Sequence, residues 1–178
     1  MGERTVRRTR LIVTAGLPGS GKSIIAEGLA RTIGAPILSV DPIEAAMWRS
    51  DIPKHMTGIA AYEVAAAVAE ENLKVGLTVI VDAVNPVEAA RATWVRLSER
   101  QKSKLIFVEA YCSDEGVHRK RIENRVRGIT GMPDIPWERV QERRAEYEPW
   151  SMDRVMIDTA KKSPEALVQD VLMQMGEV

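Results

Sequence analysis

Short, almost continuously apolar runs alternate with longer mixed stretches along the chain. The apolar runs are rich in β-branched residues and predict strands at 11–15, 36–40, 77–83, 104–111 and 154–159. The stretches between them predict helices at 22–33, 42–50, 58–74, 86–101, 114–127, 136–148 and 164–175. Such alternation is typical of a parallel sheet with right-handed crossovers and helices on both faces. The pattern therefore predicts an α/β fold of three α/β/α layers.

The length and the lack of internal repeats favour a single domain. The chain has 178 residues, which suits one well-filled core. The least regular stretch is 127–136, with two glycines and two prolines between two charged helices. Such a segment is either a plain connection or a mobile lid.

Charge and composition exclude several classes of protein. There are 25 Lys and Arg residues and 25 Asp and Glu residues, so the formal net charge is zero. Such a balance shows no overall positive charge of the kind that attracts a nucleic acid or an anionic membrane. No stretch approaches the roughly 20 apolar residues that cross a bilayer. A single cysteine, Cys112, rules out an internal disulfide and favours a cytoplasmic protein.

A phosphate-binding loop follows the first predicted strand and opens the first predicted helix. Its sequence GLPGSGKS is a full GxxxxGK[ST] match, the Walker A motif, in the strand-to-helix context that the motif requires. The glycines let backbone N–H groups turn inward, Lys22 supplies a point charge for the β- and γ-phosphates, and the Ser23 hydroxyl can bind Mg²⁺. The predicted nucleotide contacts are Gly16, Leu17, Pro18, Gly19, Ser20, Gly21, Lys22, Ser23 and Ile24.

Two aspartates stand where predicted strands end. Asp41 closes the second strand and Asp82 the third, at the edge of a parallel sheet where ligands bind. Asp82 follows Val-Ile-Val, as a Walker B carboxylate does, and is the candidate ligand for Mg²⁺. Asp41 is the candidate base for an acceptor hydroxyl. The alternative is that Asp41, and Asp82 or Asn85, only cap the helices that follow.

A second cationic element lies in the helix predicted at 114–127. Arg121 and Arg125 are four residues apart and would share one helix face. Their position just before the irregular stretch favours arginines that neutralise the transferring phosphate. A solvated basic face is the alternative.

Taken together, the loop GLPGSGKS, the aspartate after strand two, VIVDAVN, the HRKRIENR helix and EPW at 148–150 resemble a known family. They are similar to small P-loop kinases related to chloramphenicol phosphotransferase, zeta toxins and the kinase half of polynucleotide kinase. The resemblance implies an adenylate-kinase-like strand order 2-3-1-4-5, a lid at about 119–136 and a helical acceptor region at about 42–74. It also implies ATP, Mg²⁺, Asp41 as the base, and Arg121 and Arg125 on the lid.

The resemblance and the residues predict a kinase that phosphorylates a hydroxyl of a small molecule, such as a metabolite, an antibiotic or a sugar nucleotide. Many relatives carry a basic residue three positions after the strand-two aspartate, and this chain has Glu44 there. That departure, with the zero net charge, disfavours a polynucleotide 5′-hydroxyl kinase. A nucleotide-dependent ATPase or switch acting through partners is the third hypothesis, although Asp41 and the basic helix fit transfer better than hydrolysis.

Overall fold

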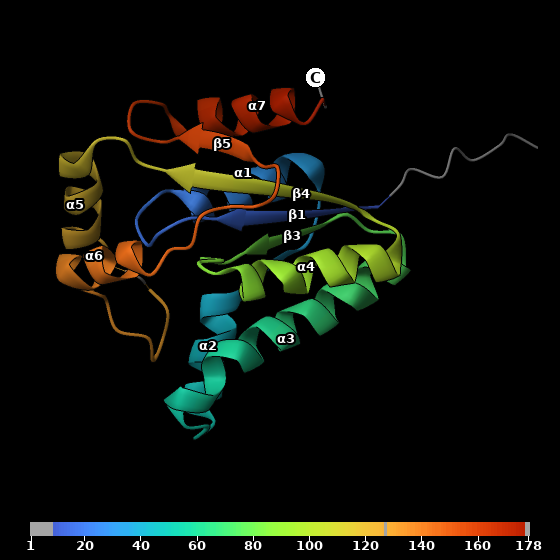
Figure 1. Cartoon of the computed structure of the whole chain (residues 1–178), viewed down its shortest axis with the longest axis horizontal. Coiled ribbons are helices and arrows are strands. Elements are labelled where there is room, and N and C mark those ends of the chain that lie inside the picture. The colour runs from blue at the N-terminus through green and yellow to red at the C-terminus, as the bar shows by residue number, and fades with distance from the viewer. Residues whose placement is uncertain (1–8, 127, 177–178) are drawn as a thin grey trace, which may run out of the picture.

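A five-stranded parallel sheet forms the centre of the protein, seen here in a computed structural model that describes residues 9–126 and 128–176 (Figure 1). The strand order is β2-β3-β1-β4-β5, which confirms the order that the resemblance implies. The strands are β1 (Arg10–Ala15), β2 (Ile37–Ser39), β3 (Val79–Asp82), β4 (Lys104–Tyr111) and β5 (Val155–Asp158).

Helices cover both faces of the sheet and gather beyond the carboxyl ends of its strands (Figure 1). Helices α1 (Lys22–Ile33) and α7 (Pro164–Gln174) pack on one face; α3 (Lys54–Lys74) and α4 (Glu88–Gln101) pack on the other. Helix α2 (Val40–Arg49) packs against α3. Helices α5 (Glu115–Glu123) and α6 (Trp137–Ala145) lie past the carboxyl ends of the strands.

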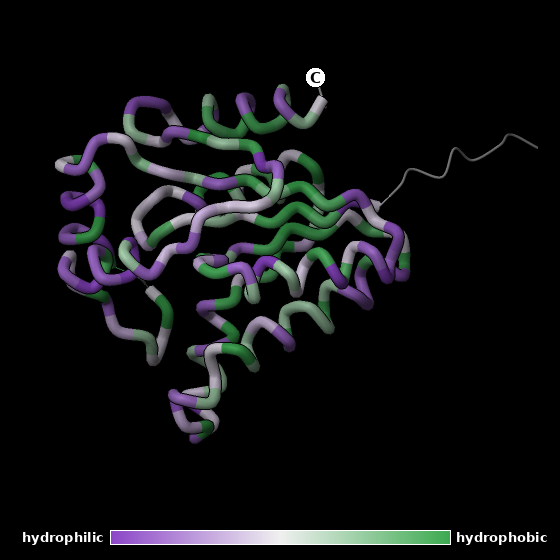
Figure 2. The backbone as a smooth tube through the Cα atoms, viewed as in Figure 1, coloured by the Kyte–Doolittle hydropathy of each residue, from purple (hydrophilic) through white to green (hydrophobic). Residues whose placement is uncertain are grey.

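The apolar runs of the sequence become strands that are buried on both sides. Leu11 and Val13 of β1 belong to the core under α3 and α4, whereas Ile12 belongs to the core under α1 and α7. Successive strand residues point to opposite faces, so a strand covered twice needs apolar residues throughout. Figure 2 shows the result, with hydrophobic residues on the central strands and hydrophilic ones on α5 and α6.

The irregular stretch before α6 lies against α2. Residues 128–136 form neither helix nor strand, while Arg127 falls outside the described residues. The guanidinium of Arg49 in α2 donates a hydrogen bond to the carbonyl oxygen of Thr130, and a Cβ on Gly131 would lie 3.1 Å from Cγ of Arg49. The stretch thus reaches the predicted acceptor region, and its role as a lid remains a prediction.

Candidate functional site

The loop between β1 and α1 is built around its glycines. Gly16 has a φ of 135° and Gly19 a φ of 78°, values that residues with a Cβ rarely adopt. A Cβ on Gly16 would lie 2.2 Å from the carbonyl oxygen of Ala110 in β4. The loop therefore sits directly against the end of β4 and leaves no room for a side chain there.

Backbone N–H groups of this loop are left for a ligand. In residues 9–126 and 128–176, nothing accepts a hydrogen bond from the N–H groups of Gly19, Gly21 and Lys22. Gly21 is the N-cap of α1 and makes no side-chain capping bond. Free N–H groups at a helix N-terminus, together with the helix dipole, attract an anion.

Lys22, the first residue of α1, is a buried cation that has no counter-ion among the residues the structure describes. It is only 4% exposed, and its ammonium group makes no hydrogen bond or ion pair within the described part of the chain. A charge taken out of water without a partner is strongly unfavourable. An anion bound at the end of α1 would relieve that cost.

Asp82 is a buried anion on the neighbouring strand. The strand register sets Asp82 beside Thr14 of β1 and Ser39 of β2, and the Thr14 hydroxyl donates to Oδ1 of Asp82 at 3.1 Å. Asp82 is 8% exposed, and none of the described cations forms an ion pair with it. Both Lys22 and Asp82 thus lack a charged partner in the residues that the structure describes.

Asp82 and Ser23 fit a Mg²⁺ site that is completed by a nucleotide. Carboxylate and hydroxyl oxygens suit this cation, which usually takes one or two carboxylates and keeps water and substrate phosphate oxygens as its other ligands. Clusters of three or more His, Cys, Asp or Glu that could hold a metal by themselves are absent from the described residues. The donor set therefore matches a shared metal rather than a self-contained metal centre.

Asp41 lies in a different element from the one predicted. The strand ends at Ser39 and α2 begins at Val40, so Asp41 is in the first turn of α2. Pro42 fits inside that turn, where its missing N–H group has no intrahelical partner to lose, and the helix can begin before it. Ser39 and Val87 are the N-caps of α2 and α4. Neither predicted aspartate is therefore a helix cap.

Tyr62 of α3 lies near charged residues of the predicted acceptor region and of α6. Its hydroxyl oxygen accepts a hydrogen bond from the N–H group of Asn85 at 3.1 Å. Burial raises the pKa of Tyr62 to about 12; the Asn85 N–H group lowers it, the charges of Asp41 and Glu44 raise it, and that of Arg143 lowers it. Residues from α2, α3, α6 and the loop after β3 thus act on one hydroxyl group, which stays protonated at neutral pH.

The polar residues between α2 and α3 are largely engaged with one another. The Thr57 hydroxyl accepts a hydrogen bond from the indole N–H group of Trp48 at 2.7 Å and lies 2.9 Å from Oε1 of Glu44. Lys54 places its ammonium group 4.5 Å from the centre of the Trp48 ring. Glu44 therefore helps to join the two helices, which accounts for an acid at this position without a substrate.

The two predicted arginines are separated by the end of α5. The helix ends at Glu123 with Asn124 as its C-cap, because asparagine is a poor helix former and commonly stands at helix ends. Arg125 therefore lies outside the helix, and the shared face predicted for the pair is wrong. Arg121 donates to the hydroxyl and carbonyl oxygens of Thr159, at 2.8 and 2.6 Å.

Thr159 brings Arg121 to the rear of the phosphate-binding loop. Its hydroxyl lies 2.7 Å from the carbonyl oxygen of Ser20 and 3.1 Å from that of Tyr111. A Cβ on Gly21 would lie 3.1 Å from Thr159. The segment after β5 thus packs against the loop, and Arg121 is hydrogen-bonded to that segment.

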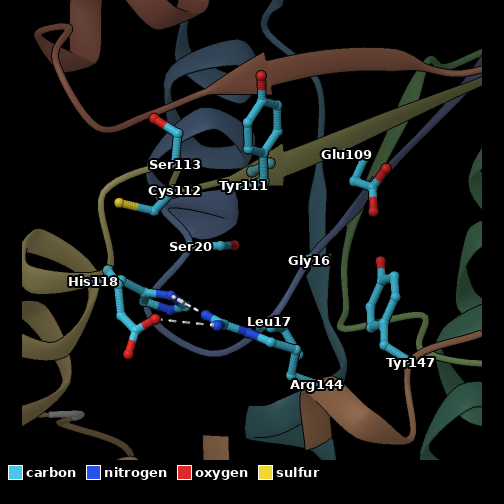
Figure 3. A pocket seen from close by; sticks show the side chains of 12 residues that line it. Gly16, Leu17, Ser20, Glu109, Tyr111, Cys112, Ser113, His118, Arg144 and Tyr147 are labelled. Atoms are coloured by element: carbon cyan, nitrogen blue, oxygen red, sulfur yellow. Dashed lines mark hydrogen bonds and ion pairs between the residues drawn. The ribbon is translucent and has the colours of Figure 1, made fainter. Parts of the chain in front are cut away.

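A cavity of about 340 Å³ lies between the loop, the end of β4, α5 and α6 (Figure 3). Ser20 faces it with a buried hydroxyl oxygen that has no hydrogen-bond partner in the described ranges. On another wall, the guanidinium of Arg144 lies 3.5 Å from Nδ1 of His118. The cavity lining is mixed in character, and the volume leaves room for a water molecule at the Ser20 hydroxyl group.

Arg91 of α4 is a fully buried residue that the sequence did not single out. Its guanidinium donates to the carbonyl oxygens of Asn85 and Pro86 after β3, and to those of Glu148 and Pro149 after α6, at 2.8–3.1 Å. It is 0% exposed. The Arg91 side chain therefore links the segment that follows Asp82 to the segment that follows α6 through hydrogen bonds to both. Nothing local in the sequence signals this role, because two of the four carbonyl groups belong to Glu148 and Pro149.

Replacing Arg91 with methionine is expected to lower the free energy of unfolding by about 3 kcal/mol or more, because four carbonyl oxygens lose their donor. Arg91→Lys should lose most of the same amount, since one ammonium group cannot reproduce the planar fork. Urea unfolding followed by circular dichroism measures both, with the exposed Arg96→Met as the control. A loss below about 1 kcal/mol in Arg91→Met would contradict this role.

Comparisons with known proteins place the chain in a family. A family model described as an AAA domain matches residues 11–150, and the chain therefore belongs to this family of AAA domains. No curated protein sequence matches it significantly. Among the described residues, no helix has the length and apolar character needed to cross a membrane.

Solved structures of kinases share the fold. The chain is similar to a sugar kinase from Janibacter sp. HTCC2649, with 21% identity, 96% of each chain covered and a TM-score of 0.69. It is similar to a gluconokinase from Sinorhizobium meliloti 1021, with 23% identity, 96% of this chain and 93% of that one covered, and a TM-score of 0.65. It is also similar to an APS kinase from Mycobacterium tuberculosis, solved with AMPPNP and APS, with 19% identity, 95% of this chain and 98% of that one covered, and a TM-score of 0.68. The fold is thus that of P-loop kinases, and the narrower resemblance to chloramphenicol phosphotransferase, zeta toxins and polynucleotide kinase stays a prediction.

Proposed function

We propose that the protein is an ATP- and Mg²⁺-dependent phosphotransferase that moves the γ-phosphate to a hydroxyl group of a small molecule. One observation carries the proposal: Lys22 is a buried cation that has no counter-ion among the described residues, at a helix N-terminus where these residues also leave the N–H groups of Gly19, Gly21 and Lys22 without an acceptor. The phosphates of a nucleoside triphosphate would supply the negative charge that Lys22 and these N–H groups lack. The sugar kinase, gluconokinase and APS kinase that share the fold support a small-molecule acceptor.

On the donor side, Lys22 and the N–H groups of Gly19 and Gly21 would bind the β- and γ-phosphates. Ser23 and Asp82 would hold Mg²⁺, which neutralises charge on the phosphate oxygens when it is bound. Asp82 is already oriented by its hydrogen bond from Thr14. Little covalent chemistry is needed from the protein, because phosphoryl transfer depends mainly on position and charge.

On the acceptor side, Asp41 would accept the proton of the attacking hydroxyl group. The hydroxyl oxygen bonds to the γ-phosphorus, the bond from that phosphorus to the β,γ-bridging oxygen breaks, and ADP leaves. The charges of Asp41 in α2 and Arg143 in α6 both influence the Tyr62 hydroxyl group in α3, which supports an acceptor pocket between these three helices. The neutral Tyr62 hydroxyl would donate a hydrogen bond to the acceptor.

Transfer of label from γ-labelled ATP tests the proposal and its alternatives. The protein is incubated with Mg²⁺ and separate pools of hydroxyl metabolites, hydroxyl-bearing antibiotics, sugar nucleotides and 5′-hydroxyl oligonucleotides. Label in a small-molecule pool is the expected result and identifies the acceptor class. Label only in the oligonucleotides would instead show a polynucleotide kinase, and release only as free phosphate in every pool would favour an ATPase or switch.

Replacing Arg143 with methionine should lower kcat by about a hundredfold, while the affinity for ATP stays near that of the wild type. Arg143 is half-buried, and it has neither a hydrogen bond nor an ion pair within the part of the chain that the structure describes. Its charge is thus available to the transferring phosphate, an interaction worth about this much in other enzymes. Initial rates with the acceptor found by label transfer measure the effect, with the exposed Arg139→Met as the control. If kcat fell equally in both variants, Arg143 would have no specific role in the site.

A further inference from the structure

Helix α5 touches the phosphate-binding loop through His118. The imidazole is 2% exposed, and its Nε2 lies 2.8 Å from the carbonyl oxygen of Pro18. A Cβ on Gly19 would lie 2.7 Å from Cδ1 of Ile122 and 3.2 Å from Cδ2 of His118. The tip of the loop is therefore in van der Waals contact with α5 and tied to it by one hydrogen bond.

That hydrogen bond fixes a peptide unit that faces the phosphate site. The carbonyl group of Pro18 and the N–H group of Gly19 belong to the same planar unit and point in opposite directions. Holding the carbonyl oxygen toward α5 turns the Gly19 N–H group away from α5. That N–H group has no partner in residues 9–126 and 128–176, so it is available to an anion.

The neighbours of His118 select one form of its ring. The carbonyl oxygen of Pro18 can only accept a hydrogen bond, so Nε2 carries the proton. On the other side, Nη2 of Arg144 lies 3.5 Å from Nδ1, and a guanidinium can only donate. Arg144 is itself 3.8 Å from a carboxylate oxygen of Glu115, and the Trp137 ring packs edge-to-face on the imidazole at 5.2 Å. The neutral Nε2–H tautomer satisfies all of these contacts.

We propose that His118 is a positioning residue that holds the Pro18–Gly19 peptide unit in its anion-binding orientation and does so as a neutral imidazole. The inference rests on the proposed role of the loop in binding nucleotide. It links α5 and α6 to the phosphate site, because Arg144 of α6 contacts the same ring. The loop would then bind phosphate best when these two helices are in place.

Protonation of His118 should oppose this arrangement. Burial lowers the pKa of His118, and the charges of Arg144 and Arg121 lower it further, against the raising effects of the Pro18 carbonyl and Glu115. A protonated Nδ1 would face the N–H groups of Arg144 with like charge. Because the folded-state pKa is depressed, the stabilisation is complete above the ordinary histidine pKa and is lost as pH falls from there toward the folded-state pKa. Nucleotide binds the folded protein, so its affinity should fall at lower pH, as pH passes through the depressed folded-state pKa itself.

Binding of Mg²⁺·AMPPNP, measured by calorimetry at pH 7.5 and at a series of lower pH values over which the protein stays folded, tests the inference. His118→Phe keeps a ring against Trp137 but loses the donor, and should bind about tenfold more weakly at pH 7.5. His118→Gln keeps a donor and should stay within about threefold of the wild type. The control is His55→Gln, which removes the other histidine, an exposed residue of α3.

The ratio of wild-type to His118→Gln affinity separates positioning from packing. It should fall as pH is lowered, because only the wild type carries the titrating ring, and protonation of AMPPNP cancels in the ratio. His55→Gln should follow the wild type at every pH. If His118→Phe does not fold, the pH dependence of this ratio still tests whether His118 positions the loop as a neutral imidazole. Wild-type affinity in folded His118→Phe, or a ratio that stays constant over the whole pH range in which the wild type is folded, would overturn the inference. A wild type that does not bind AMPPNP at all would overturn the proposed function as well.

Discussion

Replacing Lys22 with methionine is expected to abolish most phosphate transfer and, at the same time, to stabilise the ligand-free protein. The ammonium group is buried without a partner in the described residues, so its removal relieves a desolvation cost, and methionine fills a similar volume. The free energy of unfolding should rise by about 1–3 kcal/mol. Transfer should fall by about a hundred- to a thousandfold, since the main cation on the phosphates is lost.

Two measurements on this variant distinguish a binding residue from a structural one. Thermal unfolding without ligand should show the gain in stability, and adding Mg²⁺·ATP should raise the Tm of the wild type but not that of Lys22→Met. Lys120→Met, which removes an exposed lysine of α5, should change neither quantity. A ligand-free Lys22→Met protein that is less stable than the wild type would show that the lysine supports the fold in a way the contacts do not explain.

Replacing Asp41 with asparagine is expected to lower kcat by about a hundred- to ten-thousandfold, with ATP affinity unchanged. Asparagine matches the shape of aspartate but cannot accept the proton of the acceptor hydroxyl group. The position of Asp41 in the first turn of α2 favours an acidic residue there, because the helix dipole attracts negative charge. The variant should therefore also lose a few tenths of a kcal/mol, up to about 1 kcal/mol, of stability.

The loss of stability and the loss of transfer separate the two roles of Asp41. Rates with the acceptor found by label transfer, compared with urea unfolding, measure both, and the exposed Asp51→Asn after α2 is the control. Asn suits the positive φ of 62° at that position. If Asp41→Asn lost stability but kept its rate, the carboxylate would serve only the helix terminus, and another base would be required.

The sheet could be predicted because its signals are local. The run from Val79 to Val81 is apolar on both faces, as a strand of a parallel sheet covered on both sides requires. The phosphate-binding loop could be found for a similar reason, since backbone geometry around phosphate demands glycines at fixed spacing. Ends of elements were less predictable. The basic pattern continues past Glu123 although α5 does not, and nothing local to Asp41 shows that the helix starts one residue before it.

Of the proposed acceptor side, the sequence indicated Asp41 through its place near a strand end, but not how Asp41, Tyr62 and Arg143 come together, because that depends on contacts between distant segments. Tyr62, Asp41 and Arg143 come from three helices, and no spacing in the sequence relates them. Arg91 reads as an ordinary helical arginine, yet it binds carbonyl groups that lie up to 58 residues away. Such residues become visible only when the fold brings their partners together.

The most direct test of the central claim is to count both products of one reaction. With γ-labelled ATP, Mg²⁺ and the identified acceptor, ADP and labelled acceptor are measured in the same samples for the wild type and for Asp41→Asn. We expect one labelled acceptor for each ADP in the wild type, and a large, equal fall of both in the variant. ADP formed with an equal amount of free phosphate, whether or not the acceptor is present, would show that the protein hydrolyses ATP and is not a kinase.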